Sequence, residues 1–263
     1  MGSDKEKKTF IIDTCAFRPA YGENNLARIL GGVDSVTPNN YRLLRRYINL
    51  FEEVDEFVKL NDSILLPEVL RENEGFLKHL ENQRRIISRQ IRHTDFLESP
   101  EALEDFPFIF SEDLDKYVDR FFYFNDSFKR KPKNPADFNP LQQRVYRCAF
   151  ERALLIHRDN FQNGQATTLG DQLQTDRKII ATALALAIKN PVTVISRDTG
   201  LIGNICNYRS GSLKRVIDSF NFERRQHDSL NVNPQKISVY NPRDSDNGFY
   251  DSEKERVVYE RRR

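Results

Sequence analysis

The sequence predicts a mixed α/β fold with a parallel sheet. Three short apolar runs rich in β-branched residues predict buried strands at Thr9–Ile12, Ser63–Leu66 and Val192–Ile195. Longer segments between them carry apolar residues at helical spacing. Such alternation of strands and helices is typical of domains in which helices cover a parallel sheet.

The composition is that of a globular protein and excludes several classes. The chain has 263 residues, of which 38% are hydrophobic and 30% charged. Its three cysteines are widely spaced and odd in number, which argues against a disulfide framework. No run approaches the roughly 18 apolar residues of a membrane span, and no apolar signal-peptide core follows the charged start. We therefore expect a cytoplasmic protein with no membrane partner. The formal net charge of +2 does not indicate nucleic-acid binding, so only local clusters could reveal it.

Helices are predicted around these strands. Thr37 followed by Pro38 predicts a helix start, and Pro67 precedes a second helix. The apolar stripe of the first contains Leu43, Tyr47, Leu50, Val54, Phe57 and Val58. That of the second contains Val69, Phe76, Leu80, Ile87 and Ile91.

The middle of the chain shows no pattern typical of a strand. We therefore predict that residues 78–165 form a helical insertion between residues 9–77 and 166–240, which form the α/β core. Within it we expect short helices and loops over Ser99–Asn139 and a helix over Leu141–His157. A further helix is predicted over Asp176–Lys189. The remaining C-terminal elements expected are a helix near Ser212–Phe220, an edge strand at Lys236–Tyr240 and a disordered tail over residues 241–263.

Carboxylates follow the predicted strands. Asp13 and Asp198 lie just after two of them, and the carboxyl ends of parallel strands meet at one edge of a sheet. Glu68 and Glu72 share one face of a helix, and Asp176 is expected in the first turn of another. Carboxylates gathered in a cleft repel one another unless a cation neutralises them. Oxygen ligands favour Mg²⁺ or Mn²⁺.

Each acid also has a simpler interpretation. Asp13 alone is typical of a turn, and Asp198 of an Asx turn. Asp176 would suit a helix N-terminus with Thr175 as its N-cap. Glu68 and Glu72 could form a solvated helix face. Because these explanations must hold four times independently, a shared site is preferred.

Four motifs resemble those of the PIN-domain nucleases in order and context. They are Phe-Ile-Ile-Asp-Thr at residues 10–14, Leu-Leu-Pro-Glu-Val-Leu-Arg-Glu at 65–72, Thr-Asp-Arg-Lys-Ile-Ile-Ala-Thr-Ala at 175–183 and Val-Thr-Val-Ile-Ser-Arg-Asp at 192–198. The resemblance implies a Rossmann-like three-layer α/β/α fold with a central parallel sheet, here carrying a helical insertion.

The resemblance also implies a metal-dependent ribonuclease, with endonuclease action favoured. A metal-activated water would cleave RNA and leave 5′-phosphate and 3′-hydroxyl ends. By the same resemblance, Asp13, Glu72, Asp176 and Asp198 are the catalytic and Mg²⁺- or Mn²⁺-binding acids. Glu68 remains the alternative to Glu72, while Thr14 and Ser196 match supporting hydroxyls.

Basic clusters predict where RNA would bind. The residues concerned are Arg85, Arg89, Arg92, Lys129, Arg130, Lys131 and Lys133, with Tyr123, Phe124 and Phe128 beside the second group. Cations suit phosphates, and aromatic rings suit the unpaired bases of single-stranded or looped RNA. Arg42, Arg45 and Arg46 form a third basic group. A solvated charged face is the alternative for each group.

Other functions and partners stay open. The insertion could mediate homodimerisation, and a protein inhibitor is a further candidate partner. A non-catalytic RNA-binding or scaffold protein could share the fold. An aspartate-nucleophile phosphohydrolase of the haloacid-dehalogenase type also begins with a strand ending in Asp, but Cys15 stands where its second acid is expected.

Overall fold

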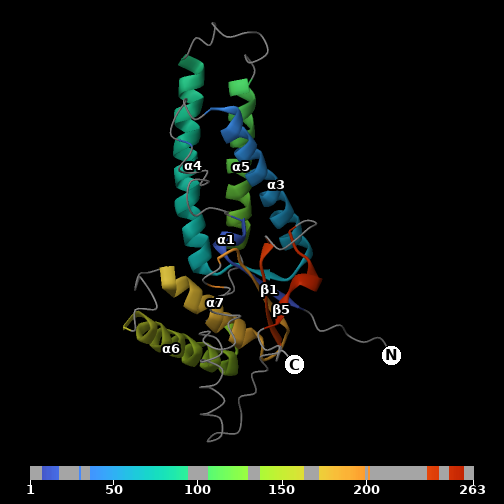
Figure 1. The fold of residues 1–263 in the computed structure, drawn as a ribbon, viewed down its shortest axis with the longest axis vertical. Helices are drawn as coiled ribbons and strands as arrows, with labels where there is room; N and C mark the ends of the chain where they lie inside the picture. Colours follow the sequence, from blue (N-terminus) through green and yellow to red (C-terminus); the bar gives the residue numbers. More distant parts are fainter. Residues whose placement is uncertain are drawn as a thin grey trace, which may run out of the picture. The chain divides into compact units, whose positions relative to one another are not determined.

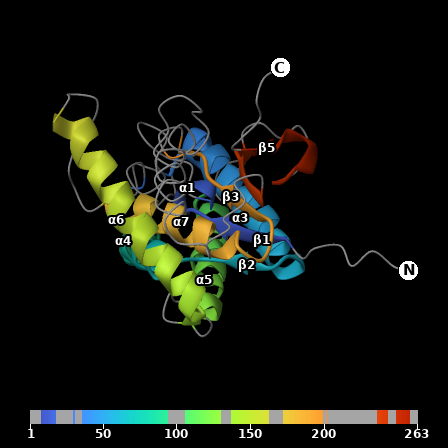
Figure 2. The same ribbon diagram turned by 90° about the horizontal axis from the view of Figure 1, so that it is seen from below.

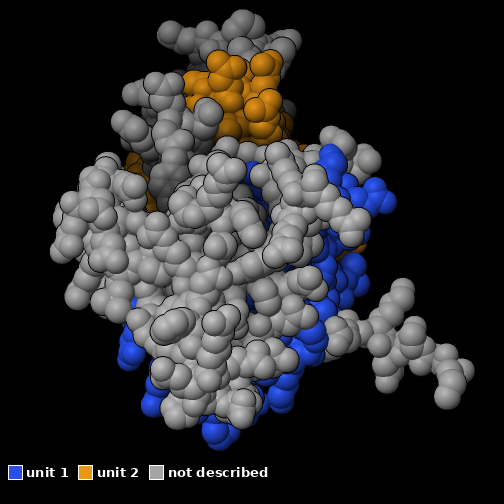
Figure 3. Space-filling model, turned by 60° about the horizontal axis from the view of Figure 1, so that its bottom comes forward, with its two compact units in different colours: residues 1–16, 57–69, 132–263 blue, residues 17–56, 70–131 orange. Residues whose placement is uncertain are grey.

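The chain folds into two compact units, each considered by itself. The computed structural model describes residues 8–17, 30, 36–93, 106–129, 137–162, 172–198, 201, 236–242 and 249–257 (Figure 1). Unit 1 comprises Met1–Ala16, Phe57–Val69 and Pro132–Arg263, and unit 2 comprises Phe17–Glu56 and Leu70–Lys131 (Figure 3, blue and orange). None of the described helices combines the length and apolar character needed to cross a membrane.

Unit 1 is built on a mainly parallel sheet, which confirms the predicted α/β class. Strands β1 (Thr9–Ile12), β2 (Ser63–Ile64), β3 (Val192–Ile195) and β4 (Ile237–Tyr240) are parallel in the order β2-β1-β3-β4. Strand β5 (Arg256–Val257) pairs antiparallel with β4. The apolar run predicted as the second strand thus pairs over two residues only. All residues of β1, β3 and β4 are buried.

Helices α6 (Pro140–Gln162) and α7 (Gln172–Leu186) pack side by side in unit 1 (Figure 2). Helix α7 also lies against β1 and β3, and its apolar residues Ile179, Ile180 and Ala183 are buried. Helix α6 is longer than predicted, whereas α7 starts four residues earlier and ends three residues earlier than the predicted Asp176–Lys189. The helix formers Gln172–Gln174 extend α7 ahead of Asp176. The helix predicted near Ser212–Phe220 lies outside the described residues.

The C-terminal segment corrects two predictions. Strand β4 is not an edge strand, because β5 covers it. The tail predicted as disordered includes ordered residues Phe249–Val257. Two aromatic rings anchor this segment: Phe249 packs on Phe57, and Tyr250 packs on Phe10 with ring centroids 5.2 Å apart. The prediction of disorder was based on the many charged residues around these two rings.

Glu255 fixes the same segment to the sheet through polar contacts. Lys8 donates to both of its carboxylate oxygens at 2.6 and 2.7 Å. The hydroxyls of Thr193, Ser238 and Tyr250 also donate to it. Burial by itself would raise the pKa of Glu255, but the hydrogen bonds from Lys8 and Tyr250 outweigh burial and leave that pKa below its ordinary value.

Unit 2 contains long helices that bury aromatic stripes. It holds most of α3 (Pro38–Leu60), most of α4 (Pro67–His93) and α5 (Phe106–Lys129). The Thr37 hydroxyl accepts a hydrogen bond from the amide of Asn40 at 3.3 Å, which confirms the predicted helix start. The predicted apolar stripe of α4 is buried.

Side-chain contacts fix the directions of the three helices in unit 2. Along α3 the partners on α5 advance with the chain, from Tyr41 with Asp113 to Phe51 with Phe124. These helices are therefore parallel. Along α4 the partners on α5 run backwards, as shown by the pairs Asn73–Asn125, Phe76–Phe121, Arg84–Asp119 and Ser88–Ser111. Helix α5 is thus parallel to α3 and antiparallel to α4.

The insertion differs from the prediction. A single 24-residue helix, α5, replaces most of the short helices and loops expected over Ser99–Asn139. Its buried residues Phe110, Leu114, Tyr117, Phe121 and Phe124 recur every three or four positions, a helical period that the mixed charges obscured. The unit boundaries also differ from residues 78–165, because α6 belongs to unit 1 and most of α3 to unit 2.

The contacts of Glu255 predict an acid-sensitive fold. Glu255→Gln should lower the free energy of unfolding by about 1–3 kcal/mol at pH 7, because the ion pair with Lys8 is lost. Since the folded-state pKa lies below the ordinary value of 4.5, this stabilisation is complete above pH 4.5 and is lost as the pH falls through the folded-state value. Denaturant unfolding at several pH values measures both effects.

The matched control is Glu253→Gln, an exposed carboxylate on the same segment. It should change the free energy of unfolding by less than about 0.5 kcal/mol. Equal effects of the two substitutions would contradict a specific contribution of Glu255.

Candidate active site at the strand β1–β3 edge

The candidate site lies where the strand order reverses. The chain passes from β1 to β2 on one side of it, and from β2 it returns past β1 to β3 on the other side. In parallel α/β sheets, ligands bind beyond the carboxyl ends of the strands at such a switch point. Asp13 follows β1 and Ser196 follows β3, with Ile12 and Ile195 in register. The sheet therefore brings these two residues to the same edge.

Asp13 is buried and held by hydrogen bonds. Asp13 is only 5% exposed to solvent. The hydroxyl of Ser196 donates a hydrogen bond to its Oδ2 atom at 2.7 Å. The Asp13 amide donates to the carbonyl of Ile195 at 3.0 Å, which extends the β1–β3 pairing by one residue. Backbone and side chain thus fix the carboxylate together. Thr14, buried beside it, begins the short helix α1 (Thr14–Phe17).

Ser196 connects Asp13 to Asp198. The fully buried Ser196 hydroxyl accepts a hydrogen bond from the Asp198 amide at 3.0 Å while donating to Asp13. The Asp198 carboxylate accepts from the amide of Leu201 at 3.3 Å, so its turn-capping interpretation is confirmed. This bond does not exclude a second role, because a carboxylate has several acceptor positions.

Asp176 lies in α7, but not at its start. The helix begins at Gln172, so Asp176 belongs to the second turn and Thr175 cannot be the N-cap. Both expectations from the sequence are wrong because the helix formers before Thr175 extend the helix. Asp176 is partly exposed. The interaction of the Asp176 carboxylate with the helix dipole is therefore weaker than expected, since this effect falls off within the first turn.

Glu68 forms an ion pair that the sequence did not indicate. Lys178 of α7 donates to Glu68 Oε1 at 2.5 Å, and the two side chains are 25% and 14% exposed. Burial raises the pKa of Tyr146 on α6 to about 12, and the negative charge of Glu68 adds to this shift. Glu68 therefore lies among side chains of α6 and α7. Only tertiary structure links Lys178 to it, since 110 residues separate them.

Glu72 is one turn further along α4 and partly buried, but it belongs to unit 2, whereas Asp13, Asp176 and Asp198 belong to unit 1. Among the described residues, no group of three or more His, Cys, Asp or Glu side chains is arranged to hold a metal ion. The four-acid metal site therefore stays a prediction.

The predicted RNA-binding residues have different environments. Arg85 and Arg89 are exposed on α4. The side chains of Arg92 and Lys129 are outside the described part, as are residues Arg130, Lys131 and Lys133. Of the rings expected to stack on bases, only Tyr123 is freely accessible, at 71% exposure.

Phe124 is buried in the helix packing and Phe128 packs on it, so the expectation that these rings stack on bases is wrong for Phe124. The sequence analysis missed the exposed Phe122, whose ring contacts Tyr123 at 5.8 Å between centroids. Its position off the buried period of α5 is the signal that would have identified it.

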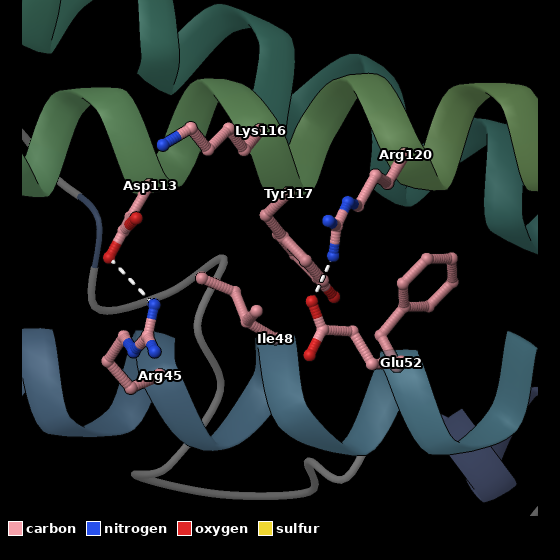
Figure 4. Close-up of a pocket in the computed structure, with 8 residues that line it drawn as sticks. Arg45, Ile48, Glu52, Asp113, Lys116, Tyr117 and Arg120 are labelled. Atoms are coloured by element: carbon pink, nitrogen blue, oxygen red, sulfur yellow. Dashed lines mark hydrogen bonds and ion pairs between the residues drawn. The ribbon is translucent and has the colours of Figure 1, made fainter. Parts of the chain in front are cut away.

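A small cavity of about 150 Å³ lies between α3 and α5 in unit 2 (Figure 4). Arg45 donates to Asp113 at 3.1 Å at one end of it, and Arg120 pairs with Glu52 at the other. These two ion pairs cross from one helix to the other, while Lys116, which also lines the cavity, pairs with Glu112 on its own helix. This arrangement indicates a structural role in joining α3 to α5.

Searches of protein-family models, curated proteins and solved structures found no match to this chain.

The Ser196 contacts predict a stabilising role for its hydroxyl. Ser196→Ala should lower the free energy of unfolding by about 1–3 kcal/mol, because a buried carboxylate loses a donor and the Asp198 amide loses an acceptor. Chemical denaturation measures the loss.

Ser63→Ala is the control, since this strand serine has a buried hydroxyl with no hydrogen-bond partner among the described residues. It should be neutral or slightly stabilising. A loss as large as that of Ser196→Ala would show that removal of any hydroxyl near the sheet has this effect.

Proposed function

We propose that the protein is a metal-dependent ribonuclease that cleaves RNA internally at the β1–β3 edge of the sheet. The observation that supports this most is the hydrogen bond between Ser196 and Asp13. It joins a carboxylate and a supporting hydroxyl from two of the four motifs, 183 residues apart, at the switch point where ligands bind in such sheets.

The residues at this edge fit a hard divalent cation. Asp13 and Asp198 supply oxygen donors only, which suits Mg²⁺ or Mn²⁺. Placing Asp13 in a buried position is costly unless charge or hydrogen bonds compensate it. When bound, the ion would lower the pKa of water and neutralise charge on a phosphate. Asp13, Asp176, Asp198 and Glu72 are the residues proposed to hold it.

The chain's own contribution at this site is orientation. Ser196 fixes Oδ2 of Asp13, and the Asp198 amide fixes the Ser196 hydroxyl in turn. A metal-binding carboxylate that is held by such a chain of hydrogen bonds keeps its orientation when the substrate enters. The buried apolar strands β1 and β3 hold the ends of this chain in register.

We assign the acid of the second motif to Glu72 rather than to Glu68. Glu68 has its charge balanced by Lys178 at 2.5 Å in a partly buried environment. Recruiting Glu68 to a cation would require that ion pair to break and leave Lys178 without its carboxylate. Glu72, one turn further along α4, is the acid to which the resemblance points, and Glu68 remains the alternative.

The proposal predicts that Asp13→Asn abolishes cleavage and preserves the fold. The amide oxygen of asparagine can still accept the Ser196 hydrogen bond, while the charge needed for the cation is lost. Cleavage of a labelled RNA should fall at least about 100-fold, with an unchanged or higher Tm in metal-free buffer. Gel analysis of RNA products and thermal unfolding measure the two effects.

Mg²⁺ or Mn²⁺ should raise the Tm of the wild-type protein and not that of Asp13→Asn. Ca²⁺ should bind without supporting cleavage. Full activity in excess EDTA would refute the metal mechanism. Metal-dependent stabilisation without any cleavage would instead favour the alternative, a non-catalytic RNA-binding or scaffold protein.

The assignment of Glu72 predicts a contrast between two neighbouring substitutions. Glu72→Gln should reduce cleavage at least about 100-fold. Glu68→Gln should retain cleavage within about tenfold and lower the free energy of unfolding by about 1–2 kcal/mol, because Lys178 loses its partner. Initial rates and denaturation curves of both variants provide the test, and the reverse pattern would assign the acid to Glu68.

A further inference from the structure

The exposed face of α4 in unit 2 carries a straight line of cations. Residues one and two turns apart on this helix share one direction, because seven positions make nearly two turns. All six residues on this face are exposed, and none is acidic. They are Arg71, Gly75, Lys78, Asn82, Arg85 and Arg89, and we call them the α4 stripe. From Arg71 to Arg89 the stripe is about 27 Å long at 1.5 Å per residue.

The cations of the stripe differ from those that hold unit 2 together. Arg45, Arg84, Lys116 and Arg120 each contact a carboxylate of a neighbouring turn or helix. By contrast, Lys78, Arg85 and Arg89 contact no carboxylate within the described part of the chain. Glu81 is four residues before Arg85, a spacing that favours an ion pair, yet no pair forms.

Gly75 gives a second, independent observation. It lies in the interior of a 27-residue helix. In that position glycine is the least favourable residue after proline. A Cβ at this position would meet no atom within 4 Å, so packing within the chain does not require glycine there. An exposed glycine between Arg71 and Lys78 lets a ligand approach the helix backbone closely.

We infer that the α4 stripe binds the phosphate backbone of a single-stranded RNA. This inference rests on the proposed function in taking RNA as the anionic ligand. Arg71, Lys78 and Arg85 lie two helical turns apart, and Arg89 follows one turn later, so the cations form a line that suits a polymer with repeated charges. Arginine also binds phosphate through two parallel hydrogen bonds.

The stripe does not have the features of a membrane-binding helix. Such a helix sets large apolar side chains beside its basic face. The exposed large apolar residues of the described chain are Leu60, Phe108, Ile109, Phe122, Tyr123 and Leu141, and none of them belongs to α4. Between the cations stand only Gly75 and Asn82. The stripe therefore suits a soluble polyanion.

The test compares two pairs of arginines with the same geometry. Arg85→Gln with Arg89→Gln removes two stripe cations four residues apart. Arg42→Gln with Arg46→Gln removes two exposed arginines at the same spacing on α3, and neither has a carboxylate partner among the described residues. Each double variant of the full chain lowers the net charge by the same amount.

Binding of a fluorescein-labelled oligouridylate is measured by anisotropy in EDTA, at about 0.05–0.2 M salt. The stripe variant should lower the slope of log Kd against log salt by about 1.4, since each lost phosphate contact contributes about 0.7. The matched α3 variant should leave the slope within about 0.3 of the wild-type value. Equal slopes for the two variants would overturn the inference.

Gly75→Gln provides a second readout that a structural role would not give. It should raise the Tm, because glutamine favours helix and the space is open, yet it should weaken binding of the oligouridylate. Unchanged binding would count against close approach of the RNA backbone. If polyglutamate or anionic vesicles bind as tightly as the oligouridylate and respond equally to the stripe variant, the ligand is not RNA.

The outcome is separable from that of the proposed ribonuclease activity. Binding in EDTA requires neither a metal ion nor cleavage. A stripe-dependent salt slope in a protein that cleaves no RNA would support this inference and refute the proposed activity. Metal-dependent cleavage with equal slopes for both variants would do the opposite.

Discussion

The pairing of β1 with β3 is the interaction on which unit 1 depends. Four buried residues of each strand are in register although about 180 residues separate them, and both strands are covered by α7. Because the strands are parallel, their carboxyl ends meet, and the residues that follow them must share one edge. The hydrogen bonds of Asp13 with Ile195 and Ser196 continue this pairing beyond the last strand residues. The candidate site is thus an extension of the sheet rather than a separate loop.

The same sheet shows how a polar network can stabilise a small α/β core. Thr193 and Ser238 are buried on neighbouring strands, where apolar residues would be expected, and both donate to Glu255. Glu255 is itself held by Lys8, so the two ends of the described chain meet over the sheet. A carboxylate with this many donors needs no further counterion. Glu255 and Asp13 therefore illustrate two uses of a buried acid, one structural and one proposed to be functional.

The sequence predicted the elements whose periodicity was local. The strands at Thr9–Ile12 and Val192–Ile195 and the helix start at Thr37 were confirmed, because run length, β-branching and capping are properties of neighbouring residues. Strand β5 and the length of α5 were missed. A two-residue strand has no detectable period, and the charges on α5 obscured a regular apolar stripe. The Glu68–Lys178 pair could not be predicted from any local pattern, since it depends on how α4 and α7 meet.

The near-zero net charge of the chain conceals two groups of charged side chains, those that form ion pairs within the fold and those that do not. In unit 2, acids of α5 such as Asp113 and Asp119 pair with Arg45 and Arg84 of the neighbouring helices. These pairs use carboxylates to fix helix contacts, whereas Lys78, Arg85 and Arg89 of the α4 stripe pair with no acid among the described residues. A sum over the sequence counts both groups alike and cancels them. Only the pairing of individual side chains distinguishes a charge that holds the fold together from one that remains available to a ligand.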